Sequence, residues 1–144
     1  MEDRYPPRIA ILSGVVTATI IGAGAFLRLY LIAEQIPLDD EWHGMMFSIE
    51  HNLGYLFNHF SRVGANSIPM NLYRRLLLTS IGWSEILLLL PAILPGLLSL
   101  FIFPRLVGKL FNERITVVFT VLFAVSPFIV FYTRVSRPYS ALTF

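Results

Sequence analysis

The chain has 144 residues, of which 56% are hydrophobic and 14% are charged, and its formal net charge is +2. Soluble domains usually carry about 25% charged residues, so this composition is that of a membrane protein, and the length is enough for one domain. The sequence has no cysteine, which excludes disulfides and cysteine-based metal sites, and its few scattered basic residues argue against nucleic acid as a partner.

Three uncharged apolar runs predict transmembrane helices. Each has 19 residues: Ile9–Leu27, Ile86–Pro104 and Ile115–Thr133. A helix rises about 1.5 Å per residue, so each run covers roughly 28 Å and matches a bilayer core of about 30 Å. The first run exceeds the apolar region of a typical signal peptide, so we expect it to remain as an anchor. With their interfacial ends, the spans are expected at about 8–33, 84–107 and 115–133.

Prolines and basic residues refine this topology. Pro91 and Pro95 predict a kink in the second span, and Pro127 a bend or end in the third. Basic residues favour the cytoplasmic side, which orients the loop 34–83 outward. The residues that set this orientation precede the first span or lie between the second and third: Arg4, Arg8, Arg105, Lys109 and Arg114.

The outer loop contains two further predicted helices. Apolar residues recur from Trp42 to Phe60 with a helical period, which predicts an amphipathic helix lying in the membrane interface, bent or split at Gly54. Pro69 is placed to open a second short helix. The expected fold class is therefore an all-α membrane protein with about three transmembrane helices, interfacial helices in the first outer loop, and the start of a fourth span at Ser140–Phe144.

Three consecutive acids, Asp39, Asp40 and Glu41, open the outer loop and support three interpretations. They are well placed to cap a helix and stabilise its first turn. A carboxylate crowded by two other acids at a low-dielectric boundary also has the raised pKa that suits a general base. A metal site with the loop histidines is the third interpretation, but three histidines spaced eight residues apart drift around a continuous helix and converge only with the break at Gly54. These histidines are His43, His51 and His59.

Arginines occupy the outer ends of two spans. Arg28 lies near the end of the first span, and its simplest interpretation is that it extends to the interface. Arg134 and Arg137 follow the third span. They either reach the interface in the same way, offset the loop acids, or bind a phosphate, for which a planar guanidinium is suited.

The order of these features resembles the GT-C superfamily of membrane glycosyltransferases, nearest to glycosyltransferase family 39, which includes protein O-mannosyltransferases and the aminoarabinose transferases of lipid A. No single segment is specific, but the colinear set covers nearly all of the chain and corresponds to the amino-terminal part of such an enzyme. The matching segments are Leu27-Arg28-Leu29-Tyr30, Asp40-Glu41, Trp83-Ser84-Glu85 with Leu90-Pro91-Ala92, Arg105–Phe111, and Ser126-Pro127 with Ser136-Arg137-Pro138-Tyr139. Leu89 departs from the pattern, because the family often has an arginine two residues before the proline of the second span.

The resemblance implies inverting transfer of a hexose or pentose from a polyprenyl-phosphate donor to a hydroxyl acceptor on a protein, lipid or glycan. It implies that Asp40 is the general base, with Glu41 in support, and leaves Asp39 as an alternative base or a substrate contact. Arg137 and Tyr139 would stabilise the leaving phosphate, and Arg28 is a weaker candidate for the same role. Neither a metal nor a cofactor is implied.

The resemblance also implies a multi-pass protein of the bacterial inner membrane, with loop 34–83 facing the periplasm. We expect residues 1–144 alone to be an inactive fragment, because three spans do not build a donor groove. The alternative is a non-enzymatic membrane scaffold or an inactive transferase remnant, in which the outer acids only cap a helix.

Overall fold

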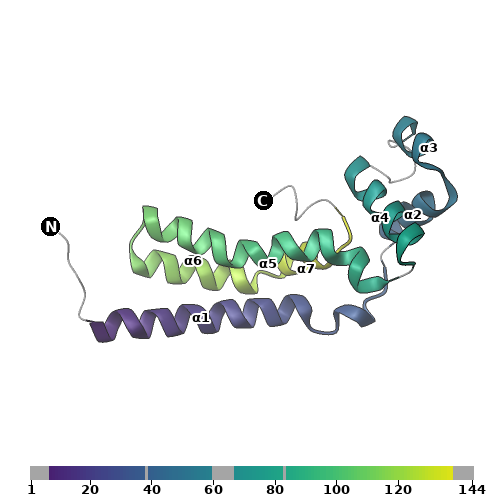
Figure 1. Ribbon diagram of the computed structural model, residues 1–144. Helices are drawn as coiled ribbons and strands as arrows, with labels where there is room; N and C mark the ends of the chain where they lie inside the picture. The colour runs from purple at the N-terminus through teal and green to yellow at the C-terminus, as the bar shows by residue number, and fades with distance from the viewer. Residues whose placement is uncertain (1–6, 38, 60–66, 83, 138–144) are drawn as a thin grey trace.

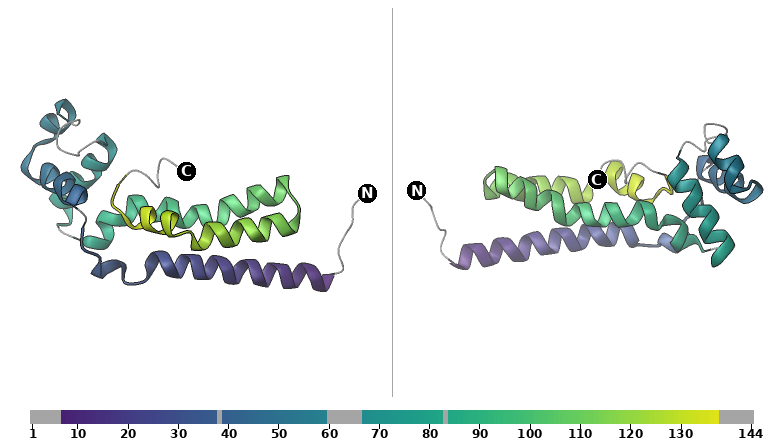
Figure 2. Two further views of the ribbon diagram at one scale, coloured as in Figure 1. Left: turned by 180° about the vertical axis from the view of Figure 1, so that it is seen from behind. Right: turned by 45° about the horizontal axis from the view of Figure 1, so that its top comes forward.

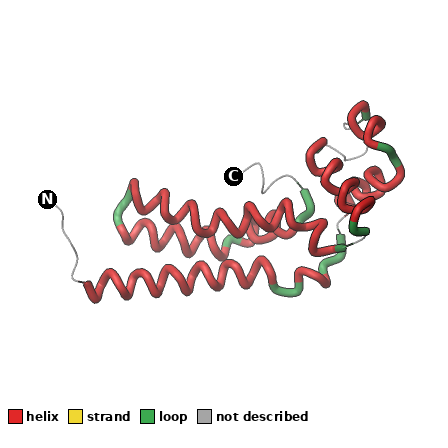
Figure 3. Tube along the Cα trace, viewed as in Figure 1, coloured by secondary structure: helices red, strands yellow, loops and turns green. Residues whose placement is uncertain are grey.

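The computed structural model describes residues 7–37, 39–59, 67–82 and 84–137, and among them it contains helices and connecting turns but no strand (Figure 1). Three rods lie side by side, formed by α1, by α5, and by α6 followed by α7 (Figure 2). A group of three short helices, α2 to α4, lies at one end of these rods (Figure 3). The helix bounds are α1 Pro7–Leu29, η1 Ile32–Glu34, α2 Asp39–Glu50, α3 Leu53–Asn58, α4 Ile68–Ser80, α5 Glu85–Leu110, α6 Glu113–Val125 and α7 Pro127–Arg134.

Short polar residues start most of these helices. Each N-cap side chain accepts a hydrogen bond from the backbone N–H three residues later, which satisfies one of the donors that a helix start leaves unpaired. The residues that cap in this way are Asn52, Ser67, Ser84, Asn112 and Ser126. Pro69 follows Ser67 in the first turn of α4, which confirms its predicted place at a helix start.

Two segments are long and apolar enough to cross a membrane, Gly14–Glu34 and Glu85–Leu110. The pair formed by α6 and α7 passes the same test when taken as one span, so two or three crossings are compatible with the described helices. The first segment was expected to be one helix to residue 33. Instead α1 ends at Leu29, and Leu31 adopts a left-handed backbone conformation with φ 52° before the turn of η1.

The prolines act differently in the second and third rods. The third is interrupted at Ser126, and α6 and α7 meet there at 50°, which confirms the bend predicted at Pro127. In contrast, α5 runs without interruption through Pro91, Pro95 and Pro104. Proline lacks the N–H that would bond to the carbonyl four residues earlier, so an uninterrupted helix requires another donor for that carbonyl. One such donor is the Tyr73 hydroxyl, which bonds to the Leu87 carbonyl, four residues before Pro91, at 2.6 Å.

Small residues allow the rods to approach closely. A Cβ added at Gly24 of α1 would lie 2.9 Å from Ala124 Cβ of α6, and one at Gly96 of α5 would lie 2.0 Å from Thr133 Cγ2 of α7. Only glycine fits either position without a shift of the neighbouring helix. In the first span, Gly24 therefore provides the close packing expected of membrane helices. Gly22 has no neighbour at such a distance.

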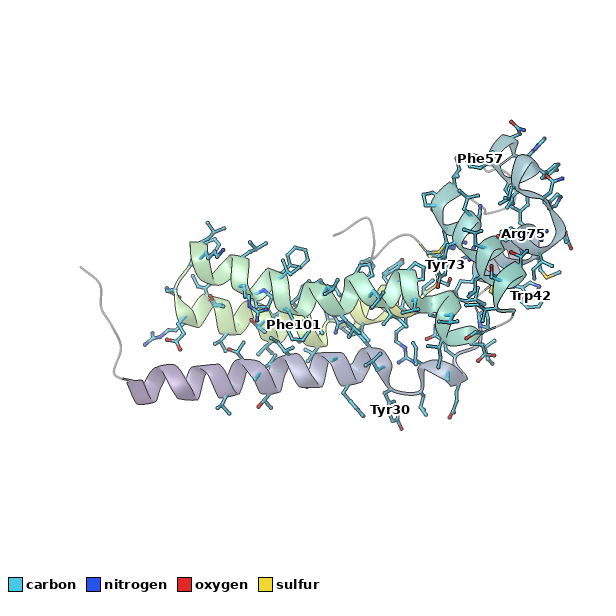
Figure 4. All side chains as sticks on the ribbon, viewed as in Figure 1. Tyr30, Trp42, Phe57, Tyr73, Arg75 and Phe101 are labelled. Carbon is cyan, nitrogen blue, oxygen red and sulfur yellow. The ribbon has the colours of Figure 1, made fainter. Side chains whose placement is uncertain are left out.

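The outer loop is helical, as predicted, but its break lies elsewhere. The helix stops at Glu50, and Asn52 caps α3, so the chain divides at His51–Asn52 and not at Gly54. Asparagine satisfies the new helix start directly, which explains the position of the break. Exposed apolar side chains remain on the outside of this group, among them Trp42 and Phe57 (Figure 4). The predicted fourth span at Ser140–Phe144 lies outside the described residues.

Candidate functional site at the outer end of the bundle

The acid cluster begins α2, at the junction between the outer helices and the three rods. Asp39 and Asp40 form the first turn of this helix. The side chain of Glu41 is buried, with only 2% of its surface exposed, and its Oε1 accepts a hydrogen bond from the backbone N–H of Ser136. This contact joins segments 95 residues apart and brings the acid cluster next to the segment that carries Arg137.

Ser136 is bound from three helices. In addition to its contact with Glu41, its carbonyl and its Oγ both accept from Nη2 of Arg74 on α4, the latter at 3.2 Å. Its hydroxyl donates to the Leu88 carbonyl of α5 at 2.9 Å. Ser136 and Arg74 are both nearly inaccessible to solvent. A single serine after α7 thus connects α2, α4 and α5.

Burial affects the ionisation of the side chains at this junction. It lowers the pKa of the Arg74 guanidinium to about 10, and the Glu41 carboxylate opposes this shift by favouring the charged form. Arg74 therefore remains charged at neutral pH. Burial also raises the pKa of the Tyr73 hydroxyl, which stays a hydrogen-bond donor to Leu87. Figure 4 shows Tyr73 between the outer helices and α5.

A small depression, with a volume of about 20 Å³, opens beside Glu41. Two carboxylates, one amide and a serine supply its polar lining, and the other lining residues are apolar. The lining residues come from α2, α5 and the segments after α1 and α7: Gln35, Pro37, Glu41, Met45, Glu85, Leu88, Leu89 and Ser136. Leu89, where the resembled family often has arginine, lines the same depression as Glu41. The arginine that acts on Glu41 in this chain comes from α4 instead.

The predicted arginines have different surroundings. Arg137 is buried, 9% exposed, and directly follows Ser136 at the junction. Arg134 exchanges two hydrogen bonds with Gln35, its Nε donating to Oε1 at 3.1 Å and its carbonyl accepting from Nε2 at 2.8 Å. Tyr139, the proposed partner of Arg137 on the phosphate, lies outside the described residues.

Arg28 does not extend to the interface, as its simplest interpretation required. It is fully buried between α1 and α6, and Nη1 donates to the carbonyls of Gly24 and Ala124, each at 2.9 Å. Nη2 donates to the Phe123 carbonyl at 3.3 Å. Phe123 lies four residues before Pro127, so Arg28 supplies a donor that the proline lacks. Its two terminal nitrogens thus bind the backbone at the bend between α6 and α7.

Two of the three loop histidines form a ring stack instead of converging on a point. His51 and His59 stack on the two faces of Tyr55, each with a centroid separation of 4.0 Å. Within the described part of the chain, no group of three histidines or carboxylates is placed to hold a metal ion.

Two residues of this junction escaped the sequence analysis, namely Arg74 and Ser136. Ser136 was quoted only as part of the family-like segment Ser136–Tyr139, with no role of its own, and Arg74 belongs to no such segment. Arg74 lies in the helix predicted to open at Pro69, and nothing in the sequence around it marks an arginine at position 74 as buried. The only available signal was the position of Ser136 immediately before Arg137.

Comparison with known proteins adds no relative. No protein-family model, no curated protein and no solved structure matches this chain.

Proposed function

We propose that the chain forms the amino-terminal, base-bearing part of a GT-C-type glycosyltransferase that uses a sugar linked to polyprenyl phosphate. One observation carries the proposal: the Ser136–Glu41 hydrogen bond unites the acid cluster with the segment bearing Arg137 at the outer end of the apolar helices. A transfer of this kind needs a base for the acceptor and a cation for the leaving phosphate in one place. The colinear resemblance to family 39 supplies the reaction class.

In this proposal the three rods cross a bacterial inner membrane, and the outer helices face the periplasm. The start of α1 and the turn between α5 and α6 lie at the same end of the bundle, opposite the outer helices (Figure 1). Lys109 near the end of α5 and Arg114 near the start of α6 flank that turn, and such basic residues favour the cytoplasmic side. The donor lies in the bilayer, with its sugar at the level of the junction.

The reaction is a single displacement at the anomeric carbon of the sugar. Asp40 takes the proton of the acceptor hydroxyl as the acceptor oxygen forms its bond to that carbon. The bond from the anomeric carbon to the phosphate oxygen breaks, and polyprenyl phosphate leaves with the electron pair. Arg137 stabilises the added negative charge, together with Tyr139. Attack from the face opposite the leaving group inverts the configuration.

The second candidate is a membrane scaffold without catalytic activity. One observation favours it: the Glu41 carboxylate already bonds to a backbone N–H inside the protein, and acids in the first turn of α2 stabilise that helix by about 0.3–1 kcal/mol each. In a scaffold, Asp39 and Asp40 are equivalent, whereas a transferase depends on one of them.

Substitution of the two aspartates separates these candidates. Membranes containing the protein, produced from its native reading frame, are incubated with a panel of polyprenyl-phosphate sugars and hydroxyl acceptors, and product is measured by mass spectrometry. We expect Asp40→Asn to reduce transfer at least 100-fold, since positioned general bases contribute about 10²–10⁴-fold. Asp39→Asn is the matched control and retains transfer. Equal transfer by both variants and the parent would remove Asp40 as the base.

A further inference from the structure

We propose that Arg74 and Ser136 are positioning residues that hold the first turn of α2 at a fixed place against the segment bearing Arg137. The contacts among these residues are a property of the fold. Their effect on catalysis rests on the proposed function. We call the three residues Glu41, Arg74 and Ser136 the junction clamp.

The connectivity of the clamp supports this role. Glu41 is the immediate neighbour of Asp40, and Ser136 is the immediate neighbour of Arg137. The hydrogen bond from the Ser136 N–H to Glu41 therefore couples the two segments that the proposed reaction must keep in register. Arg74 reinforces this bond from the opposite side by binding the carbonyl and hydroxyl of the same serine.

The chemistry of Arg74 suits a fixed link and not a solvent-exposed charge. Its side chain is 3% exposed, and a Cβ added at Gly44 of α2 would lie 2.5 Å from its Nη1. The guanidinium thus fills the space above a glycine of the very helix that it positions. One terminal nitrogen, Nη2, donates to two acceptors of Ser136, and the rigid guanidinium plane holds that nitrogen in place better than the flexible stem of a lysine holds its ammonium.

Arg75 provides a matched control on the same helix. Its Nη1 donates to the Ile49 carbonyl at 2.8 Å and to the Ser48 carbonyl at 3.4 Å, so it links α4 to α2 within the outer group. None of these bonds reaches the rods. Loss of Arg75 therefore removes an arginine of equal size without releasing the outer helices from α7.

A distance measurement tests the clamp. Because the sequence has no cysteine, spin labels attach only to the cysteines that are introduced. Spin labels are placed on cysteines introduced at the exposed positions Glu50 of α2 and Phe128 of α7, and the full chain is reconstituted in lipid nanodiscs. We expect a narrow distance distribution in the parent and at least a twofold broader one in Arg74→Met. The Arg75→Met control keeps the narrow distribution. An unchanged width in Arg74→Met would overturn the clamp.

A smaller substitution separates loss of the clamp from general misfolding. Ser136→Ala removes only the hydroxyl, which bonds to Arg74 and Leu88, and leaves the backbone N–H for Glu41. We expect an intermediate broadening in this variant and a partial return to the narrow distribution in Arg74→Lys, which keeps the charge. The same narrow distribution in Ser136→Ala and the parent would contradict the role assigned to this hydroxyl.

A kinetic measurement then tests the positioning role. A misplacement of about 1 Å can lower turnover on the order of 100-fold, so we expect Arg74→Met to lower kcat strongly with little change in KM. Unchanged kcat in a variant with a broadened distance distribution would overturn the positioning role. If the protein produced from its native reading frame transfers no sugar at all, the proposed function fails, and the distance measurement alone still decides the clamp.

Discussion

Proline residues leave carbonyls without a backbone donor, and in this protein two distant side chains replace the lost donors. Tyr73 bonds to the Leu87 carbonyl, which Pro91 leaves free, and Arg28 bonds to the Phe123 carbonyl, which Pro127 leaves free. An unpaired carbonyl is costly in a membrane interior, because no water is present to bind it. Each of these side chains therefore stabilises a helix other than its own.

The tyrosine offers a clean test of this compensation. In Tyr73→Phe the ring stays and only the hydroxyl is lost, so the Leu87 carbonyl loses its donor. We expect a loss of about 0.5–1.5 kcal/mol in the free energy of unfolding, the usual net contribution of one hydrogen bond, because this bond is only partly buried. Thermal unfolding in detergent measures it. Tyr30→Phe, at an exposed ring, is the control and should unfold at the parental temperature; an equal fall in both variants would refute the compensation.

The sequence identified the positions of these residues but not their partners. Arg28 was recognised as a charge near the end of an apolar run, and its burial could not be foreseen because its acceptors lie 95 and 96 residues away. Backbone carbonyls also carry no sequence signature. The same reason hid Ser136, since its contact with Glu41 uses a backbone N–H that any residue except proline provides.

At the scale of the elements, helix pairs meet where one of them has no side chain. The contact of α5 with α7 depends on Gly96 against Thr133, and that of α1 with α6 on Gly24 against Ala124. Alanine favours a helix over glycine by about 1 kcal/mol when space permits. Whether a Gly→Ala change raises or lowers the stability of this protein therefore depends on the side chain that faces the glycine.

This dependence predicts opposite effects for two glycines. Gly96→Ala would place a methyl group against Thr133, and we expect a loss of about 1–3 kcal/mol, the usual cost of overpacking. Gly22→Ala meets nothing within 4 Å and is expected to leave stability unchanged or to raise it slightly. Chemical denaturation in mixed micelles measures both changes.

A second substitution tests the cause of the loss. Thr133→Ser removes the methyl group nearest to the added Cβ, and should restore part of the stability of Gly96→Ala. A Gly96→Ala variant as stable as Gly22→Ala would show that α5 and α7 do not need this close contact.

Element boundaries were predictable where a local rule decides them, and less so elsewhere. Pro127 ended α6 as expected, because a missing N–H acts within four residues. The break of the outer helix was misplaced to Gly54, because glycine only permits a bend, whereas the Asn52 side chain actively caps the next helix. The end of α1 at Leu29 follows no local signal that we can identify.

Across the whole molecule, the rods and the outer group differ in the residues that they expose and bury. The rods expose large apolar side chains along their length, including Val15, Leu94, Val118 and Leu122, as expected of helices surrounded by lipid. The outer group buries charged and polar residues, such as Glu41, Asn71 and Arg74, where it meets the rods. The outer group also exposes apolar side chains, among them Trp42 and Phe57. The exposed apolar side chains of the rods fit helices that are embedded in lipid.

This arrangement predicts that the two ends of the bundle lie on opposite sides of the membrane. Two exposed positions are suited to single cysteines: Glu50 in the outer group and Leu110 beside the turn between α5 and α6. A membrane-impermeant thiol reagent added to intact cells should label Glu50→Cys, and should label Leu110→Cys only after the inner membrane is opened. Labelling of both in intact cells would refute the three-span topology.

The position of Arg28 also bears on the order of events during synthesis. The first span carries a buried cation whose acceptors on α6 are made 95 and 96 residues later. At about 5–20 residues per second, the nascent chain waits on the order of 5–20 seconds for them. During this interval the charge needs water, anionic headgroups or the insertion machinery itself as a substitute. We therefore expect the first helix to complete its lateral release into lipid only after α6 has been made, so that the two enter the bilayer as a pair.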